Sequence, residues 1–330
     1  MAILCTFGIN DKGVAAVRPD EQGQMRLHVD GSCNVLGILD FGRVQAVPYL
    51  LYGPNAKQPP YSFPGKPTLI FNQISDADSH PVALQRCEEL CRHVGVPVIN
   101  PPEAVLKTTR DQVAEYLHDI PGVRAPRTLR VAPASPAEVF DIIESEGLDY
   151  PVIQRRTGEH NARSMVLLHG RKDLDKLHVF PFDGRDFYLT EFVDFSDERG
   201  VFYKHRIVMV DGEPMPRHVF FNNDWKVNSS CVGFMKAHPE FGTPAANLDA
   251  LERERLPKAS EALKEIANRL QLDYFGVDCQ IAPDGEILLF EANANMNMMV
   301  DVLPEISDRI QAIKQRLGAM VENRSGERFT

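Results

Sequence analysis

The sequence predicts an α/β protein in which a small parallel α/β unit is followed by antiparallel sheets. The first observation is a strand, a helix and a second strand in succession between residues 67 and 100, which is typical of a parallel unit. The second is a series of short apolar strands between residues 151 and 221, two of them joined by an Asp-Gly hairpin turn. The third is a pair of strands between residues 274 and 291, which a short turn makes antiparallel neighbours.

Length, composition and charge are those of an ordinary globular protein. At roughly 100–200 residues per domain, a chain of 330 residues predicts two or three structural units. Hydrophobic residues make up 43% and charged residues 25%, so a core of normal size needs no disulfide or metal for its stability. The net charge of −10, with no block of Lys and Arg, argues against a nucleic-acid partner because phosphates would be repelled.

The N-terminus and the cysteines favour a cytoplasmic location. The chain begins without a basic segment and a long apolar run, so we expect no signal peptide. No apolar stretch reaches the length of a membrane span, so we expect no membrane partner. The six cysteines form no CxxC pair, which argues against a zinc ribbon. Cys87 and Cys91 are expected to be packed thiols on one helix face rather than metal ligands with His93.

The first 105 residues are expected to form one small α/β domain. Apolar runs at 35–39 and 44–51, separated by Gly and Pro, suggest strands and turns. The stretch 52–66 is rich in Pro and Gly and predicts a loop. The parallel unit follows, with a strand at 67–72, a helix at 81–94 and a strand at 97–100.

The rest of the chain predicts helices around antiparallel strands. Helices are expected at 108–118, 136–146, 251–270 and 304–321, with Gly147 ending the second of them. The expected strands are 151–154, 164–169, 186–192, 202–210, 213–221, 274–281 and 286–291.

The last strand pair carries the strongest chemical pattern in the sequence. Counted outward from the turn, Asp278 and Glu291 fall at comparable heights, and Glu291 and Asn293 share one face because side chains alternate along a strand. Two carboxylates and an amide oxygen are the hard ligands that Mg²⁺ prefers. The alternative is a solvated rim of polar strand ends. The apolar runs that precede these carboxylates favour the metal site, because a buried charge without a partner is costly.

These motifs resemble the ATP-grasp superfamily, especially its RimK-like and glutathione-synthetase-like carboxylate–amine ligases. The run GVD…DGEILLFEAN resembles the family's metal-binding end, and the resemblance extends over roughly residues 95–322. Further matches are VPVINPPEAVLKTTRDQVAEYL, APRTLRV, YPVIQRRTGEH and YLTEFVDF. The resemblance implies an ATP-grasp fold with an N-terminal pre-ATP-grasp domain at 1–105, a central lobe at 106–192 and a C-terminal lobe at 193–330.

The resemblance also implies two cofactors, ATP and Mg²⁺. Asp278, Glu291 and Asn293 would hold two magnesium ions that bridge the phosphates, and Mn²⁺ can replace them. Glu191, Phe192 and Val193 would hold adenine, through hinge backbone groups and the Glu191 side chain. The segment 157–164 would be a mobile phosphate lid.

Two positions depart from the family pattern at the phosphate end. Arg155 stands where the family usually has Lys, and the lid has one glycine, Gly158, where the family often has several. His160 and Arg163 are therefore candidates for phosphate contacts. Gln112 replaces a family Lys that contacts nucleotide.

Other polar residues of the C-terminal lobe are candidates by the same resemblance. Arg206 matches a family Arg near the phosphates, and Arg155 and Arg206 would be the catalytic residues that neutralise charge on the transferred group. A nucleophilic role for Cys231 is disfavoured because the expected intermediate forms on the substrate. Further candidates for phosphate or substrate contacts are Lys204, Arg217, His218, Lys226 and Asn228, with a solvated role as the alternative.

The function implied is amide formation through an acyl phosphate, on an amino acid or peptide. Two alternatives stay open: an ATP-grasp kinase or ester- or thioester-forming enzyme, and a catalytically quiet ATP-binding protein. A dehydrogenase is disfavoured because no GxGxxG follows a strand. The substrates are not named by the sequence. A homodimer is common in the family, and nothing in the sequence argues for or against it.

Overall fold

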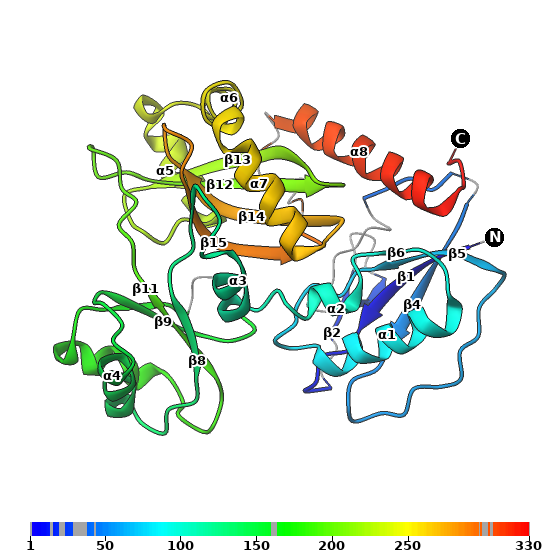
Figure 1. Ribbon diagram of the computed structural model, residues 1–330, viewed down its shortest axis with the longest axis horizontal. Helices are drawn as coiled ribbons and strands as arrows, with labels where there is room; N and C mark the ends of the chain where they lie inside the picture. The colour runs from blue at the N-terminus through cyan, green and yellow to red at the C-terminus, as the bar shows by residue number, and fades with distance from the viewer. Residues whose placement is uncertain are drawn as a thin grey trace.

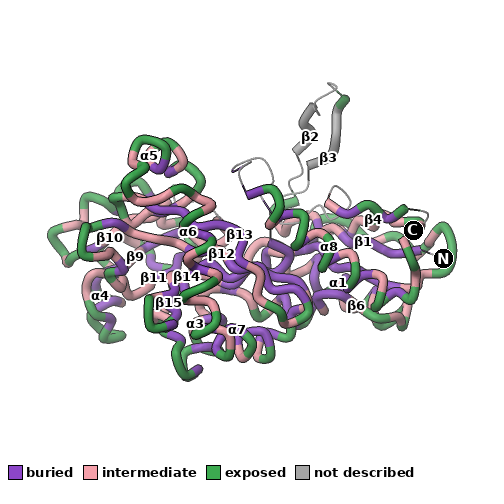
Figure 2. The backbone as a smooth tube through the Cα atoms, turned by 90° about the horizontal axis from the view of Figure 1, so that it is seen from above, coloured by how far each residue is buried: buried purple, intermediate pink, exposed green. Residues whose placement is uncertain are grey.

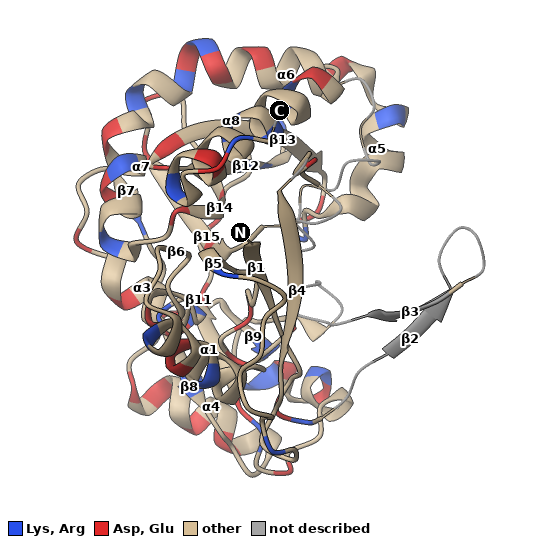
Figure 3. Cartoon of the chain, turned by 90° about the vertical axis from the view of Figure 1, so that its right-hand side faces the viewer, with Lys and Arg blue, Asp and Glu red and all other residues tan. Residues whose placement is uncertain are grey.

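Three larger β-sheets and a two-stranded pair, with the helices that cover them, make up the described part of the molecule, and the three larger sheets occupy separate parts of Figure 1. The computed structural model describes residues 2–13, 16–19, 24–28, 38–42, 44–159, 164–296, 298, 303 and 306–329. None of the helices in these ranges combines the length and the apolar character needed to cross a membrane. Acidic and basic residues alternate along the outer helices (Figure 3).

The first sheet is the predicted parallel unit. Its order is β4 (Gln45–Leu51), β1 (Ala2–Gly8), β5 (Pro67–Asn72) and β6 (Val98–Ile99), and all its pairs are parallel. Helix α1 (Pro81–Val94) buries Leu84, Cys87 and Leu90 and ends at Gly95, whose positive φ suits a left-handed cap. A short helix α2 (Pro102–Val105) follows β6.

Three features of the first 60 residues differ from the expectation. Strand β1, an inner strand of the first sheet, was not predicted. A small antiparallel pair, β2 (Ala16–Pro19) and β3 (Met25–His28), was not predicted. The strand predicted at 35–39 falls mostly outside the described residues, and its last two residues are not in a strand.

The second sheet is antiparallel and has a core of its own. Its order is β10 (Val166–Leu168), β9 (Val152–Arg156), β11 (Phe187–Glu191) and β8 (Thr128–Val131). Helix α4 (Pro136–Ser145) packs Val139, Phe140 and Ile143 against this sheet. Ser135 caps the helix by accepting a hydrogen bond from the Glu138 N–H at 3.2 Å. A 3₁₀ segment η3 (Arg171–Val179) completes the unit.

The third sheet is the largest and carries the strand pair singled out in the sequence. Its order is β13 (Glu213–Asn222), β12 (Phe202–Val210), β14 (Tyr274–Ile281), β15 (Ile287–Ala294) and β7 (Val123–Arg124), with only β7 and β15 parallel. Strand β15 continues to Ala294, so Glu291 and Asn293 lie within the strand rather than after it.

Helices surround the third sheet on several sides. Helix α3 (Arg110–Leu117) lies beside β15, and α8 (Ser307–Ser325) lies against β12, β13 and the first sheet (Figure 1). The helix predicted at 251–270 is a π-helical turn (Leu251–Arg255) followed by α7 (Leu256–Leu270). The remaining elements were not predicted: η4 (Ser229–Cys231), α5 (Val232–Ala237), η5 (Pro239–Phe241) and α6 (Pro244–Ala250).

The first and third sheets share hydrophobic cores. One cluster joins Leu4 and Ile70 of the first sheet with Ile207 and Val277 of the third. A second cluster joins the other face of the first sheet to α8. The buried backbone runs through the sheets, and the helices around them expose their outer faces (Figure 2). The domain limits expected at residues 105 and 192 stay a prediction.

Candidate functional site

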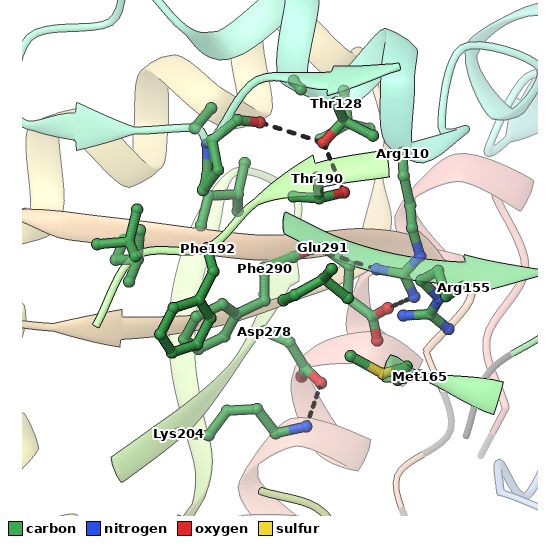
Figure 4. A pocket seen from close by; sticks show the side chains of 18 of the residues that line it. Arg110, Thr128, Arg155, Met165, Thr190, Phe192, Lys204, Asp278, Phe290 and Glu291 are labelled. Carbon is green, nitrogen blue, oxygen red and sulfur yellow. Dashed lines mark hydrogen bonds and ion pairs between the residues drawn. The ribbon is translucent and has the colours of Figure 1, made fainter. Parts of the chain in front are cut away.

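A pocket lies between the second and third sheets and is lined from both sides. Strands β8, β9 and β11 contribute one wall, and β12, β14, β15 and helix α3 contribute the other. Figure 4 shows Thr128, Arg155 and Thr190 from the first group facing Lys204 and Glu291 from the second. The enclosed space is about 180 Å³.

One end of the pocket is aromatic. Phe192 meets Trp225 edge to face, with ring centroids 5.8 Å apart, and Phe195 meets Phe290 at 4.8 Å. The three residues predicted to hold adenine all line the pocket, namely Glu191, Phe192 and Val193. Flat apolar walls of this kind suit a planar aromatic ligand.

Backbone groups at this end are partly committed to the fold. The Glu191 N–H donates to the Arg127 carbonyl at 3.0 Å, and the Phe192 N–H donates to the Pro151 carbonyl at 2.9 Å. The Val193 N–H donates to no backbone carbonyl of the described residues. Of the three residues predicted to hold adenine, Val193 is therefore the one whose backbone donor is open to a ligand.

The other end of the pocket is polar, and it brings together the three predicted metal ligands. Asp278 and Glu291 are directly opposite each other in the β14–β15 ladder, which confirms the prediction that they lie at comparable heights. Asn293 lies opposite Gly276 and also lines the pocket. A register shift after Asp278 marks a bulge in this ladder. Bulges are frequent where a strand aims side chains into a site.

Asp278 is held by two cations from the neighbouring strand. Its carboxylate accepts from the Lys204 Nζ at 3.0 Å and from the Arg206 Nε and Nη2 at 2.6 and 2.8 Å. The Asp278 side chain is only 1% exposed. Burial alone would raise the pKa of Asp278, but Arg206 and Lys204 outweigh burial and hold the pKa below its usual range.

Glu291 is paired with a residue that sequence reasoning missed. The Arg110 guanidinium, at the start of α3, forms an ion pair with Glu291 and donates to the Phe290 carbonyl at 3.2 Å. A cation in the first turn of a helix is unfavourable with the helix dipole unless an anion compensates it. That misplaced charge was the signal in the sequence, although nothing there named Glu291 as its partner.

Arg155 lies beside Arg110 at the same end (Figure 4). The Arg155 residue is 8% exposed, and its Nη2 donates to the Glu159 carbonyl, while its Nε has no partner among the described residues. Burial and then the Arg110 charge lower the pKa of Arg155. Two buried guanidinium groups side by side favour an anion between them.

The remaining candidates divide into those at the pocket and those away from it. Lys226 and Asn228 line the pocket, and the Lys226 ammonium lies 5.3 Å from the Trp225 ring centroid. Arg206 is not part of the lining and contacts the lining residue Asp278. Gln112 is not part of the lining either. His160 and Arg163 lie outside the described residues.

Three candidates are buried in the third sheet or behind it. Arg217 is fully buried and donates from its Nε to the Met298 carbonyl at 2.5 Å. His218 stacks on Phe220 at 4.0 Å, and burial followed by the Arg206 charge lowers its pKa well below the usual value. Burial also raises the pKa of the Cys231 thiol, which makes that thiol a poorer nucleophile.

The donor set at the polar end fits a magnesium–nucleotide complex. Two carboxylates and an amide supply hard oxygens at one place in the ladder. Four cations surround them, an excess of two positive charges (4 − 2), which suits polyphosphate. The cations are Arg110, Arg155, Lys204 and Arg206, and the anions are Asp278 and Glu291.

Comparison with known proteins finds relatives in sequence. No protein-family model matches the chain. N-acetylaspartylglutamate synthase A of Homo sapiens is 23% identical over 229 residues, which cover 68% of this chain and 51% of the relative. β-Citrylglutamate synthase B of Homo sapiens is 23% identical over 233 residues, 68% and 52% of the two chains. This chain thus spans about half the length of the curated relatives that it matches.

Solved structures match over nearly the whole chain. D-Alanine–D-alanine ligase from Bacillus anthracis aligns with a TM-score of 0.58 and 14% identity, over 98% of this chain and 97% of that one. A RimK domain ATP-grasp protein from Sphaerobacter thermophilus aligns with a TM-score of 0.53 and 13% identity, over 96% and 99%. The fold that the sequence predicted is therefore confirmed, and this chain is an α/β protein with the ATP-grasp fold.

Proposed function

We propose that the chain is an ATP-dependent, ADP-forming carboxylate–amine ligase whose active site is the pocket between the second and third sheets. One observation carries the proposal: an aromatic end lies next to a polar end in which four cations surround two carboxylates. The aromatic end suits adenine, and the polar end suits phosphates with bound Mg²⁺.

Each group at the pocket has a part in this proposal. The Val193 N–H and the Glu191 side chain bind the adenine edge, between Phe192 and the apolar strand β15. Arg155, with Arg110 beside it, binds phosphate oxygens as a fork. Lys204 and Arg206 contribute positive charge beside Asp278.

Asp278, Glu291 and Asn293 are the residues that would hold Mg²⁺, which supplies charge neutralisation of the phosphates when bound. The reaction begins when a substrate carboxylate attacks the γ-phosphorus of ATP and ADP leaves. An amine then attacks the acyl phosphate, loses a proton and displaces inorganic phosphate, which yields the amide. Positioning and electrostatics carry this chemistry, because no protein nucleophile is required.

The acceptor is proposed to be an amino acid or a peptide. Both curated relatives are named for products that contain glutamate, so glutamate belongs among the first amino acids to test. The domain limits at residues 105 and 192, a cytoplasmic location and a homodimer are also proposals. Helix α3 and strand β7 pack on the third sheet, so residues 110–124 link the central lobe to that sheet.

The test is release of ADP and free phosphate with ATP and Mg²⁺, in the presence of pooled amino acids and small peptides. Equal amounts of ADP and phosphate that depend on one pool support a ligase. ADP without free phosphate indicates a kinase, and nucleotide binding without turnover in any pool indicates a quiet binding protein.

A second test uses variants of one proposed metal ligand. Glu291→Gln keeps the size of the side chain, and Glu291→Ala removes its oxygens as well. We expect both to reduce ADP formation by about 100-fold or more, since a lost ligand and a lost charge act at the transferred phosphoryl group. ADP formation near the wild-type rate in both variants would contradict the metal assignment.

A further inference from the structure

Asp78 lies on the loop between β5 and α1 of the first sheet, yet its carboxylate contacts the second sheet. The Tyr188 hydroxyl donates to its Oδ1 and Oδ2 at 2.7 and 2.8 Å, and the Gly158 N–H donates to its Oδ2 at 3.2 Å. Arg130 forms an ion pair with the same carboxylate. The Asp78 side chain is 11% exposed. One carboxylate thus joins two parts of the molecule whose hydrophobic cores are separate.

The loop that carries Asp78 is itself tied down. The Asp78 and Ser79 N–H groups donate to the Asp76 carboxylate at 2.9 and 3.4 Å, and the Ser79 carbonyl accepts from the Asp11 N–H at 2.8 Å. The Val82 N–H, in the first turn of α1, donates to the Asp11 carboxylate at 3.3 Å. The carboxylate of Asp78 is therefore presented from a fixed backbone.

The groups that Asp78 holds flank Arg155 on two sides. Tyr188 is the direct partner of Arg155 in the β11–β9 ladder, so the two side chains lie next to each other on one face. Gly158 lies three residues after Arg155, in the turn that follows β9. The negative charge of Asp78 also supports the charged form of Arg155 against its burial.

We propose that Asp78 is a positioning residue of the nucleotide site, which fixes Arg155 at the polar end of the pocket by holding Tyr188 and the Gly158 turn. The inference rests on the proposed function of that pocket. It adds that the first sheet, which contributes no residue to the lining, sets the geometry of a phosphate-binding arginine. Asp78 itself does not line the pocket.

Asp78→Asn is the informative variant because it preserves size and removes one acceptor. The Arg130 Nη2 donates to the Asp78 Oδ1, so an asparagine keeps its oxygen at that position and turns its amide nitrogen toward the Gly158 N–H, which then loses its acceptor. Arg130 keeps Asp111 and Asp186, at 3.3 Å each, so it is not left unpaired. Asp186→Asn is the matched control, since its side chain pairs with Arg130 and is bonded to neither Tyr188 nor Gly158 among the described contacts.

The sign of the change in ATP affinity separates positioning from simple charge competition. Loss of a negative charge near Arg155 and Arg110 would, by electrostatics alone, tighten the binding of an anion. Loss of the correct position of Arg155 would instead weaken ATP binding. Trp225 is the single tryptophan and lines the pocket, so its fluorescence reports binding of ATP with Mg²⁺. We expect Asp78→Asn to raise the Kd for ATP by about tenfold and Asp186→Asn to leave it unchanged.

A double-mutant cycle tests whether the effect passes through Arg155. In an Arg155→Gln background, Asp78→Asn should change the Kd for ATP by less than about twofold, because the residue that it positions is gone. An equal penalty in both backgrounds would overturn the proposal, and so would tighter or unchanged ATP binding in Asp78→Asn alone.

A measurement without ligand keeps the test independent of the proposed function. Hydrogen exchange at the Gly158 amide should be faster in Asp78→Asn than in the wild type or in Asp186→Asn. Unchanged exchange would overturn the positioning role even if the wild type bound no ATP. Failure of the wild type to bind ATP at Trp225, with the exchange result as expected, would overturn the proposed function and with it the role of Asp78 toward ATP.

Discussion

At the scale of single residues, each carboxylate at the polar end of the pocket is paired with one or two cationic side chains. Asp278 has Lys204 and Arg206, and Glu291 has Arg110. A buried charge without a partner costs several kcal/mol, so each set is stable only as a whole. Under the proposed function, both kinds of charge are needed at this place to bind phosphates and Mg²⁺.

The pair of Arg110 and Glu291 predicts strong coupling in stability. Their side chains are 16% and 15% exposed, so Arg110→Gln and Glu291→Gln should each lower the free energy of unfolding by about 2 kcal/mol. The double variant should lose less than the sum, because no lone charge then remains. Urea unfolding measures all three, and strictly additive losses would show that the pair contributes nothing as a pair.

His205 predicts a pH dependence of stability. Burial, followed by the Arg255 charge, lowers the pKa of His205 to about 3. Below about pH 6.5, this histidine becomes protonated in the unfolded chain but stays neutral in the native state. The free energy of unfolding therefore falls as the pH drops from about 6.5 toward 3, by up to about 1.4 kcal/mol per pH unit. His218, whose pKa is also lowered, acts in the same direction.

The measurement compares urea unfolding at pH 7 and pH 5. His205→Asn keeps an acceptor for the Ile281 N–H, which donates to the His205 Nδ1 at 2.8 Å, and should flatten the dependence. His178, with a side chain 62% exposed, serves as the control position. If His205→Asn and His178→Asn leave the same slope, the neutral buried state of His205 is the wrong explanation.

At the scale of elements, hydrophobic periodicity located most helices and strands within a residue or two. Strand β5, helix α1, strand β12 and strand β14 begin and end where the sequence predicted. Apart from the nine-residue η3, the unpredicted elements have two to seven residues, such as β7 and α5. Two to seven residues hold too few apolar positions to show a period, and such segments form because their neighbours cover them.

The packing of helix α1 on strand β1 predicts that Gly8 tolerates no larger side chain. A Cβ on Gly8 would lie 2.9 Å from the Ala83 Cβ and 3.0 Å from the Ile74 Cδ1, and the Ala83 Cβ cannot move without its backbone. Gly8→Ala should therefore lower the free energy of unfolding by about 1–3 kcal/mol through overpacking.

The matched control is Gly233, which lies in α5 with open space where its Cβ would be. Gly233→Ala should be neutral or stabilise by up to about 1 kcal/mol, since Ala is the better helix former. Thermal melts of both variants give the comparison. Equal melting temperatures for the two would mean that α1 moves freely relative to β1.

At the scale of the whole molecule, the first and third sheets are joined by a buried polar residue. The Asn100 Oδ1 accepts from the Asp273 and Tyr274 N–H groups, both at 2.9 Å. Its Nδ2 donates to the Tyr274 carbonyl at 2.6 Å and to the Asn295 Oδ1 at 2.8 Å. Four bonds from one side chain, together with the shared hydrophobic cores, make these sheets one body and leave the second sheet as the separate unit.

This junction predicts a large loss of stability from a small change. Asn100 has a positive φ of 54°, so Asn100→Gly relaxes the backbone while it removes all four side-chain bonds. We expect the free energy of unfolding to fall by about 3 kcal/mol, because buried amides and carbonyls lose their partners. Gln271→Gly, at an exposed position with φ of 55°, is the control and should be nearly neutral. If Asn100→Gly lowered the free energy of unfolding no more than Gln271→Gly does, the side chain of Asn100 would not stabilise the junction.

The sequence by itself determined the fold class, most elements and the placement of Asp278, Glu291 and Asn293 on one strand pair. These rest on local patterns: periodicity within a strand or helix, and a short turn that places Asp278 beside Glu291. Only the tertiary structure decided the partners of the buried charges, such as Arg110 for Glu291 and Asp78 for Tyr188, which are 181 and 110 residues apart. Spacing along the chain says nothing about such pairs, because packing of separate sheets brings them together and the low polarity of the interior then requires that they match.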